Sequence, residues 1–189
     1  MLIGFIGCPC SGKTTTAAKL FAALKADGIS TEFIVEQARW YIAQKRLRSK
    51  GPLVLTDDDQ FRIMLKQYQI EQTFKAVCPP ETLIISDTTA LSAMLYMTAE
   101  QRESQEVQQL CYEAVKLYDV IYTASPVLSF DRLDSNRVHD EQQSRAIAAK
   151  IEPLLASVLP TSVPVVPLVG SIEIRFSTVL RDVLLRFGY

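Results

Sequence analysis

The amino-acid sequence predicts an α/β protein, a three-layer sandwich in which helices cover both faces of a five-stranded parallel sheet. Three observations lead to this prediction. Five short apolar segments of strand length recur along the chain, and segments of helical length separate them. The 189 residues suit a single domain over 1–189 with a full hydrophobic core. Hydrophobic residues make up 48% of the chain and charged residues 22%, which is typical of a globular domain.

Each expected strand is a short apolar run between polar or turn residues. The five runs span residues 2–6, 31–35, 82–86, 120–123 and 163–169. The helices are expected at residues 37–48, 57–75, 90–97, 98–117, 141–158 and 172–187, after a first helix that ends at Gly28. Thr56 or Asp57 is expected to cap the helix at 57–75. Asp59 or Gln60 would complete a capping box there. Pro153 is expected to end the regular part of the helix at 141–158 early.

Residues 7–14 read Gly-Cys-Pro-Cys-Ser-Gly-Lys-Thr and match the pattern G-x-x-x-x-G-K-T. The pattern lies between an expected strand and an expected helix, so backbone N–H groups and the positive end of the helix dipole would face a phosphate group. We expect Lys13 to reach the terminal phosphates and the Thr14 hydroxyl to ligate Mg²⁺. The sequence therefore predicts a nucleoside triphosphate site whose binding residues are Gly7, Cys8, Pro9, Cys10, Ser11, Gly12, Lys13, Thr14 and Thr15.

Two acidic residues follow expected strands, at the edge where parallel sheets bind ligands. Asp87 follows Leu-Ile-Ile-Ser and is expected beside Mg²⁺, which prefers oxygen ligands. Capping of the next helix is a second interpretation of Asp87 and is compatible with the first. Glu36 could accept the proton of a substrate hydroxyl or hold a water on the metal. Its structural alternative is a weak surface ion pair with Arg39. Other polar positions past strands are Thr88, Ser125 and Gly170.

A charged segment at about 129–140 lacks periodicity, and we expect it to be a mobile lid. Three arginines in or after it could neutralise the charge that phosphoryl transfer spreads over the transferred group: Arg132, Arg137 and Arg145. A solvated charge run is the alternative, and it is a stronger alternative for Arg132 than for Arg137. A basic cluster at 45–50 is either a solvated helix end or a contact to a nucleic acid backbone. Trp40 could stack on a base or pack in the core.

Bulk properties exclude several classes of protein. The net charge of −1 gives no global attraction to nucleic acid or to an anionic membrane. No apolar run approaches the roughly 18 residues of a membrane span. The cysteines fit no zinc spacing, and one histidine cannot support a histidine metal cluster. Because an expected strand begins at Leu2 without a basic leader, we expect a cytoplasmic protein that has no membrane partner.

These motifs together resemble the nucleoside- and nucleotide-kinase branch of the phosphate-loop enzymes. More narrowly, they resemble the family typified by the ribosylnicotinamide kinase domain of the bacterial NAD regulator, which small phage kinases also resemble. The matching pieces span almost the whole chain in the family's order: residues 7–15, 35–39, 84–88, 118–121, Asp134 with Arg137 and Arg145, and 170–175. The family usually shows Asp-Gly-x-Arg in its lid, where this chain has Asp-Ser-Asn-Arg at 134–137.

The resemblance implies a role for each matching position. Lys13 would lie on the phosphates, and Thr14 and Asp87 would lie around Mg²⁺. The acceptor would lie beside Glu36 and Arg39. Apart from the resemblance, Trp40 and Thr88 are two further candidates for binding the substrate. Arg137 would belong to the lid, and residues 169–173, Gly170 among them, would lie near adenine.

The sequence thus predicts an ATP-dependent kinase that transfers the γ-phosphoryl group to a hydroxyl of a nucleoside-like acceptor, a nucleoside or a nucleotide. A second resemblance, to phage polynucleotide kinases and to phage kinases that act on 5-hydroxymethyluracil within DNA, makes a hydroxyl in DNA an alternative acceptor. It rests on Gly-Cys-Pro-x-Ser-Gly-Lys and Ile-Ile-Ser-Asp-Thr. A third hypothesis is a P-loop ATPase or switch without a small acceptor. A homodimer is compatible with the kinase hypotheses.

Overall fold

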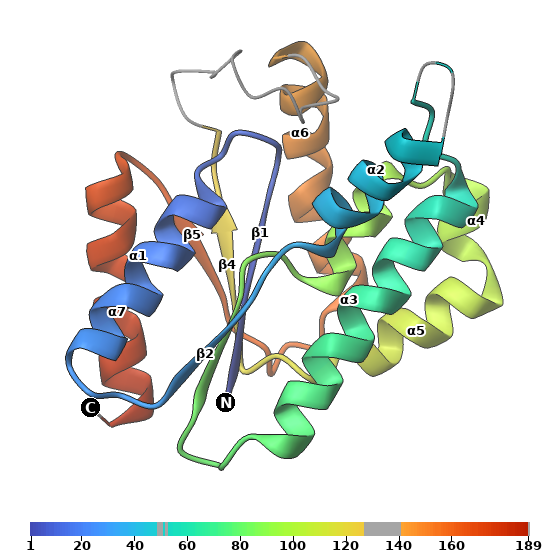
Figure 1. The fold of residues 1–189 in the computed structure, drawn as a ribbon. Coiled ribbons are helices and arrows are strands. Elements are labelled where there is room, and N and C mark those ends of the chain that lie inside the picture. The colour runs from blue at the N-terminus through green and yellow to red at the C-terminus, as the bar shows by residue number, and fades with distance from the viewer. Residues whose placement is uncertain (49–50, 52, 127–140, 189) are drawn as a thin grey trace.

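The computed structural model describes residues 1–48, 51, 53–126 and 141–188, and its centre is a five-stranded sheet (Figure 1). All pairings in the sheet are parallel, and the strand order is β2-β3-β1-β4-β5. The strands are β1 (Leu2–Gly7), β2 (Thr31–Ile34), β3 (Leu83–Ser86), β4 (Val120–Ala124) and β5 (Val165–Leu168). The predicted α/β class and five-stranded parallel sheet are confirmed.

The described residues form eight helical elements that connect and follow the strands. They are α1 (Lys13–Ala26), α2 (Gln37–Arg48), α3 (Asp57–Val77), the 3₁₀ helix η1 (Ala90–Tyr96), α4 (Ala99–Glu103), α5 (Gln105–Val115), α6 (Glu141–Val158) and α7 (Ile172–Phe187) among the described residues. None of these helices is long and apolar enough to cross a membrane.

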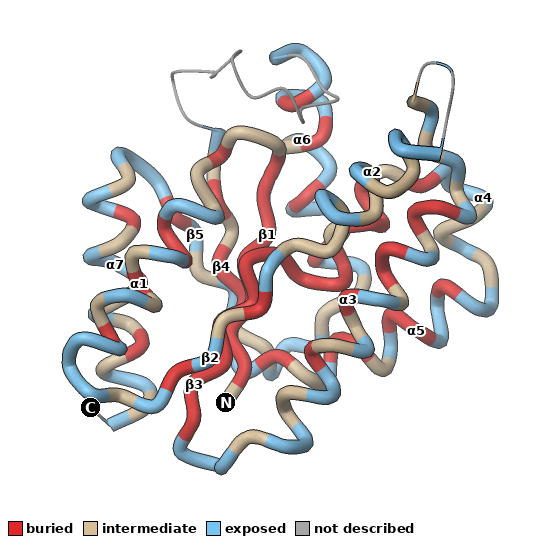
Figure 2. Tube along the Cα trace, viewed as in Figure 1, coloured by how far each residue is buried: buried red, intermediate tan, exposed pale blue. Residues whose placement is uncertain are grey.

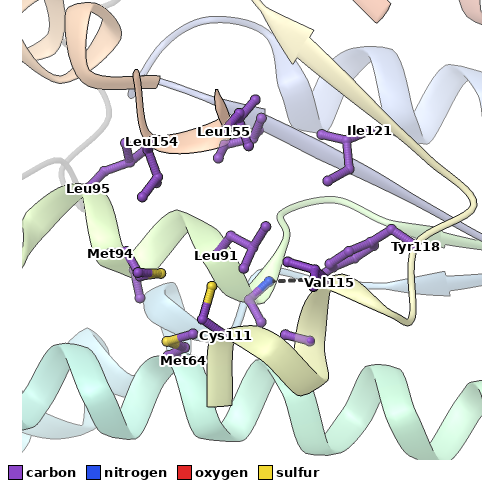
Figure 3. Packing of buried hydrophobic residues seen from close by; sticks show 14 of the residues in the cluster. Met64, Leu91, Met94, Leu95, Cys111, Val115, Tyr118, Ile121, Leu154 and Leu155 are labelled. Atoms are coloured by element: carbon purple, nitrogen blue, oxygen red, sulfur yellow. Dashed lines mark hydrogen bonds between the residues drawn. The ribbon is translucent and has the colours of Figure 1, made fainter. Parts of the chain in front are cut away.

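Side chains of the central strand β1 alternate between two hydrophobic clusters, one on each face of the sheet. Leu2 and Ile6 join the cluster formed by α3, η1, α5 and α6, part of which Figure 3 shows. Ile3 and Phe5 join the cluster formed by α1 and α7. All six residues of β1 are buried, and buried segments concentrate along the sheet in Figure 2. Helices on both faces therefore make β1 apolar throughout.

Local signals account for most element boundaries, and two expectations were wrong. Thr56 caps α3 and forms a reciprocal capping box with Asp59, which decides between the two expected boxes. The polar stretch expected as one helix at 98–117 is two helices, α4 and α5. Ser104 lies between them with extended backbone, and its side chain caps α5 by accepting from the Val107 N–H. Pro153 does not end α6, which continues to Val158.

The last strand, β5, forms an edge of the sheet and contains Pro167. The backbone N–H groups of Ile121 and Ser125 donate to the carbonyls of Pro164 and Leu168. Alternate residues of a strand direct their backbone groups to opposite sides. Pro167 therefore presents its nitrogen to the outer edge of the sheet.

Candidate functional site

The loop between β1 and α1 is shaped by its backbone. Gly7 ends β1 beside β4, and a Cβ there would lie 2.8 Å from the Ala124 carbonyl oxygen. Cys10 and Gly12 have positive φ angles of 64° and 78°. Gly12 is the N-cap of α1 and has no side chain to accept a hydrogen bond, so the cap residue's side chain does not occupy the first N–H groups of the helix. The loop can therefore offer backbone donors to an anion.

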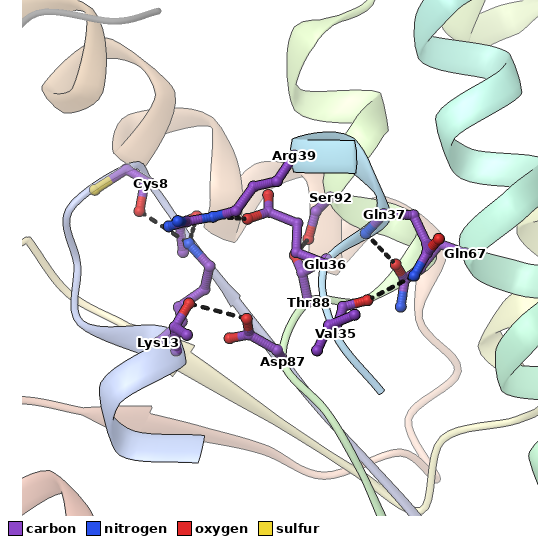
Figure 4. A network of polar contacts seen from close by, with 12 residues as sticks. Cys8, Lys13, Val35, Glu36, Gln37, Arg39, Gln67, Asp87, Thr88 and Ser92 are labelled. Atoms are coloured by element: carbon purple, nitrogen blue, oxygen red, sulfur yellow. Dashed lines mark hydrogen bonds and ion pairs between the residues drawn. The ribbon is translucent and has the colours of Figure 1, made fainter. Parts of the chain in front are cut away.

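Lys13 folds back over this loop. Its Nζ donates to the carbonyl oxygens of Gly7 at 2.9 Å and Cys8 at 3.0 Å (Figure 4). The ammonium group is thus held at the loop itself, within reach of a phosphate bound there.

Thr14 and Asp87 meet at the carboxyl edge of the sheet. The Thr14 hydroxyl donates to Asp87 Oδ2 at 2.9 Å. Asp87 is buried, and its Oδ1 has no hydrogen-bond partner in the described part of the chain. Burial raises the pKa of Asp87 above its ordinary value, nearby Glu36 adds to the rise, and the Thr14 hydrogen bond opposes it.

This pair fits a magnesium ion. A buried carboxylate oxygen without a partner and a neighbouring hydroxyl are hard oxygen ligands of the type that Mg²⁺ prefers. The described residues contain no group of three or more His, Cys, Asp or Glu side chains that could hold a metal. A site of one or two protein ligands is nevertheless usual for Mg²⁺, which takes its other ligands from phosphates and water.

A cavity of about 200 Å³ is lined by the phosphate loop and by residues beyond it, and we call the part beyond the loop the second compartment. The compartment lies between the start of α2, the start of α3 and the segment from the end of β3 through η1. Its lining beyond the loop consists of Glu36, Ala38, Arg39, Ile42, Leu55, Gln60, Ile63, Thr88, Ser92 and Tyr96. Apolar side chains and polar groups occur in this lining in similar numbers, and small-molecule sites combine the two kinds of group.

Glu36 and Arg39 both line this compartment. Arg39 Nε lies 3.2 Å from Glu36 Oε2, so the expected ion pair is present. Both of its members line the cavity. The Arg39 side chain is 55% exposed, which makes the pair weak. Thr88 lines the same compartment from the end of β3. The structure thus brings the phosphate loop, Glu36, Arg39 and Thr88 to one cavity.

Other candidate residues lie apart from it. Trp40 is 57% exposed and does not line the cavity. Arg145, in the first turns of α6, forms an exposed ion pair with Glu141 at 2.9 Å and does not line the cavity either. Lys45, from the basic cluster, pairs with the buried capping residue Asp59. The predicted lid at 129–140, with Arg132 and Arg137, falls outside the described residues.

Arg175 is a residue of the site region that the sequence reasoning did not single out. Its buried guanidinium donates from Nη1 to the carbonyls of Ser11 at 2.5 Å and Ser125 at 2.9 Å, and from Nε to that of Gly170 at 2.8 Å. Burial lowers its pKa below the ordinary value. One arginine of α7 therefore joins the loops that follow β1, β4 and β5. Two signals in the sequence point to Arg175: it ends the matching piece at 170–175, and it is a charged residue on the apolar stripe of a helix.

Residues 2–175 match the model of a protein family described as an AAA domain. The chain belongs to this family. No curated protein matches the chain in sequence.

Solved structures share the fold. One is a structure of NadR protein in complex with NR, with a TM-score of 0.73 and 19% sequence identity. The match covers 100% of this chain and 52% of the NadR chain. A second NadR structure, with NAD and AMP-PNP, has a TM-score of 0.68 at 20% identity and 49% coverage of its chain. This chain thus spans about half the length of the NadR chains. Thymidylate kinase from Candida albicans has a TM-score of 0.58 at 16% identity, with 98% of this chain and 91% of that one covered.

The fold is therefore that of the P-loop nucleoside and nucleotide kinases, and the resemblance inferred from the sequence is confirmed.

Proposed function

We propose that this chain is a kinase that uses ATP and Mg²⁺ to phosphorylate a hydroxyl group of a nucleoside-like acceptor, a nucleoside or a nucleotide. The observation that carries the proposal is one cavity lined both by the phosphate loop and by residues of the second compartment. A phosphate donor in the loop and an acceptor in the compartment would meet within this cavity, whose lining includes Lys13 and Glu36.

The reaction would be a direct transfer. The acceptor oxygen would bond to the γ-phosphorus, the bond from that phosphorus to the ADP oxygen would break, and the hydroxyl proton would pass to a carboxylate. Glu36 is proposed as this base because it lines the compartment, whereas Asp87 already accepts a hydrogen bond from Thr14. The ion pair with Arg39 would hold the Glu36 carboxylate in place.

Positive charge would come from the loop and from the metal. Lys13 would exchange its two carbonyl contacts for phosphate oxygens. Thr14 and Asp87 would hold Mg²⁺, which supplies charge against the phosphate oxygens when bound. The lid role of Arg132 and Arg137, and with them Arg145, stays a prediction. So do the contacts of Trp40 with the acceptor and of Gly170 with adenine.

A transfer assay with labelled ATP tests the proposal. One pool would hold free nucleosides and nucleotides, the other DNA with and without hydroxymethylated bases. We expect label in small molecules. Label only in DNA would replace the acceptor by a DNA hydroxyl, and brisk release of phosphate without either pool would identify an ATPase. In both cases the proposed acceptor would be wrong.

A further inference from the structure

The buried face of α3 carries a cluster of polar side chains beneath the candidate site. Glu71 is fully buried, and so is Gln67 one turn earlier. Glu71 Oε1 accepts from Ser86 Oγ at 2.6 Å and from Gln67 Nε2 at 3.3 Å. Glu71 Oε2 accepts from Tyr118 Oη at 2.5 Å. The Glu71 carboxyl group is buried from solvent and accepts from three side-chain donors. These hydrogen bonds offset part of the free-energy cost of burying it.

Each of these donors leads to a segment that lines the candidate site. Ser86 is the last residue of β3 and precedes Asp87, and its Oγ also lies 2.8 Å from the Thr88 carbonyl oxygen. Tyr118 Oη accepts from the N–H of Ala90, the first residue of η1.

Gln67 leads to the third segment. Its Oε1 accepts at 3.1 Å from the N–H of Gln37, which begins α2 directly after Glu36 (Figure 4). Its Nε2 lies 3.1 Å from Ser86 Oγ, so Gln67 also contacts the end of β3.

We propose that Glu71 is a positioning residue of the site, which holds from α3 the segments that carry Asp87, Thr88, Ser92 and Glu36. It acts through Ser86, Tyr118 and Gln67 and touches no reacting atom. An apolar side chain of similar size would fill the same space without desolvating a carboxyl group. The carboxyl group differs from an apolar side chain because its hydrogen bonds are directional. They fix the positions of the donor groups more closely than apolar packing does. Burial raises the pKa of Glu71 to about 7, against the lowering effect of its three side-chain donors and of the Ala90 backbone N–H.

A pair of tyrosine variants tests this role. Tyr118→Phe keeps the ring but removes the hydroxyl that joins Glu71 to the Ala90 N–H. Tyr122→Phe is a matched control, because the Tyr122 hydroxyl also donates to a carboxylate, that of Asp182 at 2.8 Å. Tyr122 belongs to the cluster on the opposite face of the sheet. An effect on the site that comes only from a general loss of stability would also appear in Tyr122→Phe.

Two measurements separate positioning from stability. We expect Tyr118→Phe to speed hydrogen exchange of backbone amides in residues 86–96, and Tyr122→Phe to leave them unchanged. We also expect Tyr118→Phe to reduce at least fivefold the gain in ADP affinity that Mg²⁺ provides, with Mg²⁺-free ADP affinity within twofold of wild type. The second expectation rests on the proposed function in taking Asp87 as a magnesium ligand. Neither measurement needs phosphoryl transfer, so both can be made and interpreted even if the transfer assay detects no product.

Equal exchange and equal Mg²⁺ dependence in Tyr118→Phe and Tyr122→Phe would overturn the proposal. If Tyr118→Phe does not fold, Glu71→Gln takes its place, since it keeps the size of the side chain and replaces one of the two acceptor oxygens by an NH₂ donor. Either Tyr118 on one side, or Ser86 and Gln67 on the other, then faces a donor instead of an acceptor. The same changes in exchange and in Mg²⁺ dependence are expected for it. Wild-type behaviour of Glu71→Gln in both measurements would show that the carboxylate does not position the site.

Discussion

Lys13 holds the loop with the same atom that is proposed to hold the phosphates. Lys13→Ala removes two contacts to loop carbonyls and the charge beside the transferred group. We expect transfer to fall by about 100-fold or more, with the circular dichroism spectrum unchanged. Lys66→Ala, at an exposed lysine of α3 outside the cavity, is the control and should transfer at the wild-type rate. Equal rates for the two variants would contradict the role of Lys13.

Asp87 combines a functional role with a cost to stability. Asp87→Asn keeps an acceptor for Thr14 but removes the charge. We expect the Mg²⁺ concentration for half-maximal ADP binding to rise by about tenfold, because Mg²⁺ favours charged oxygen ligands. Since burial raises the pKa of Asp87, the folded protein favours the neutral group, and the variant should melt no lower than wild type without metal. Asp58→Asn, at an exposed acid of α3 that pairs with Arg62, is a control for Mg²⁺ binding and should leave the Mg²⁺ concentration for half-maximal ADP binding unchanged. Calorimetric titration and thermal melts provide the measurements.

At the scale of elements, α7 fixes three loops through Arg175. Arg175→Met fills similar space but leaves carbonyls of Ser11, Ser125 and Gly170 without this donor. We expect a loss of about 2 kcal/mol or more in the free energy of unfolding. Weaker ADP binding is expected as well, since one of the three carbonyls belongs to the phosphate loop. Urea unfolding and ADP titration measure these effects. Arg181→Met, at an exposed position of α7, should leave both near wild type.

Local patterns in the sequence were sufficient to predict most elements. The phosphate loop, Glu36, Asp87 and Thr88 could be predicted because each follows a strand, and parallel strands bring their carboxyl ends to one edge. The break at Ser104 was missed because nothing at 98–117 is a helix breaker such as glycine or proline. The side chain of Ser104 instead starts a new helix by capping it.

Residues that act through distant partners could not be predicted. Glu71 and Arg175 are charged side chains on buried helix faces. In the sequence they appear as interruptions of the apolar pattern of a helix, and that pattern does not say whether the residue has a partner. Their meaning depends on partners far away in the chain, Tyr118 for Glu71 and Ser11 for Arg175. Only the fold brings these groups together. Trp40 is exposed and lies outside the cavity, so its contact with the acceptor stays a prediction.

For the whole molecule, Glu71 makes stability depend on pH. Its pKa is about 7 in the folded protein, above the ordinary value of 4.5, so the folded state binds a proton more tightly than the unfolded state. The stability from this group is complete below about pH 4.5 and is lost as pH rises through 7, at up to about 1.4 kcal/mol per pH unit. Glu71→Gln should lack this loss. Urea unfolding of both proteins between pH 4.5 and 8 should therefore show the variant gaining on wild type as pH rises. A constant difference would contradict the assignment.

Pro167 bears on how whole molecules can associate. The edge of an open sheet is a template on which a strand of another molecule can add, and such addition leads to aggregation. The nitrogen of Pro167 faces this edge at β5 and carries no hydrogen. A strand of a second molecule that paired with β5 would therefore lack one backbone N–H donor, at Pro167 within this four-residue strand. Pro167 thus disfavours pairing of two sheets through β5, both in a homodimer, which the kinase hypotheses allow, and in edge-to-edge aggregation.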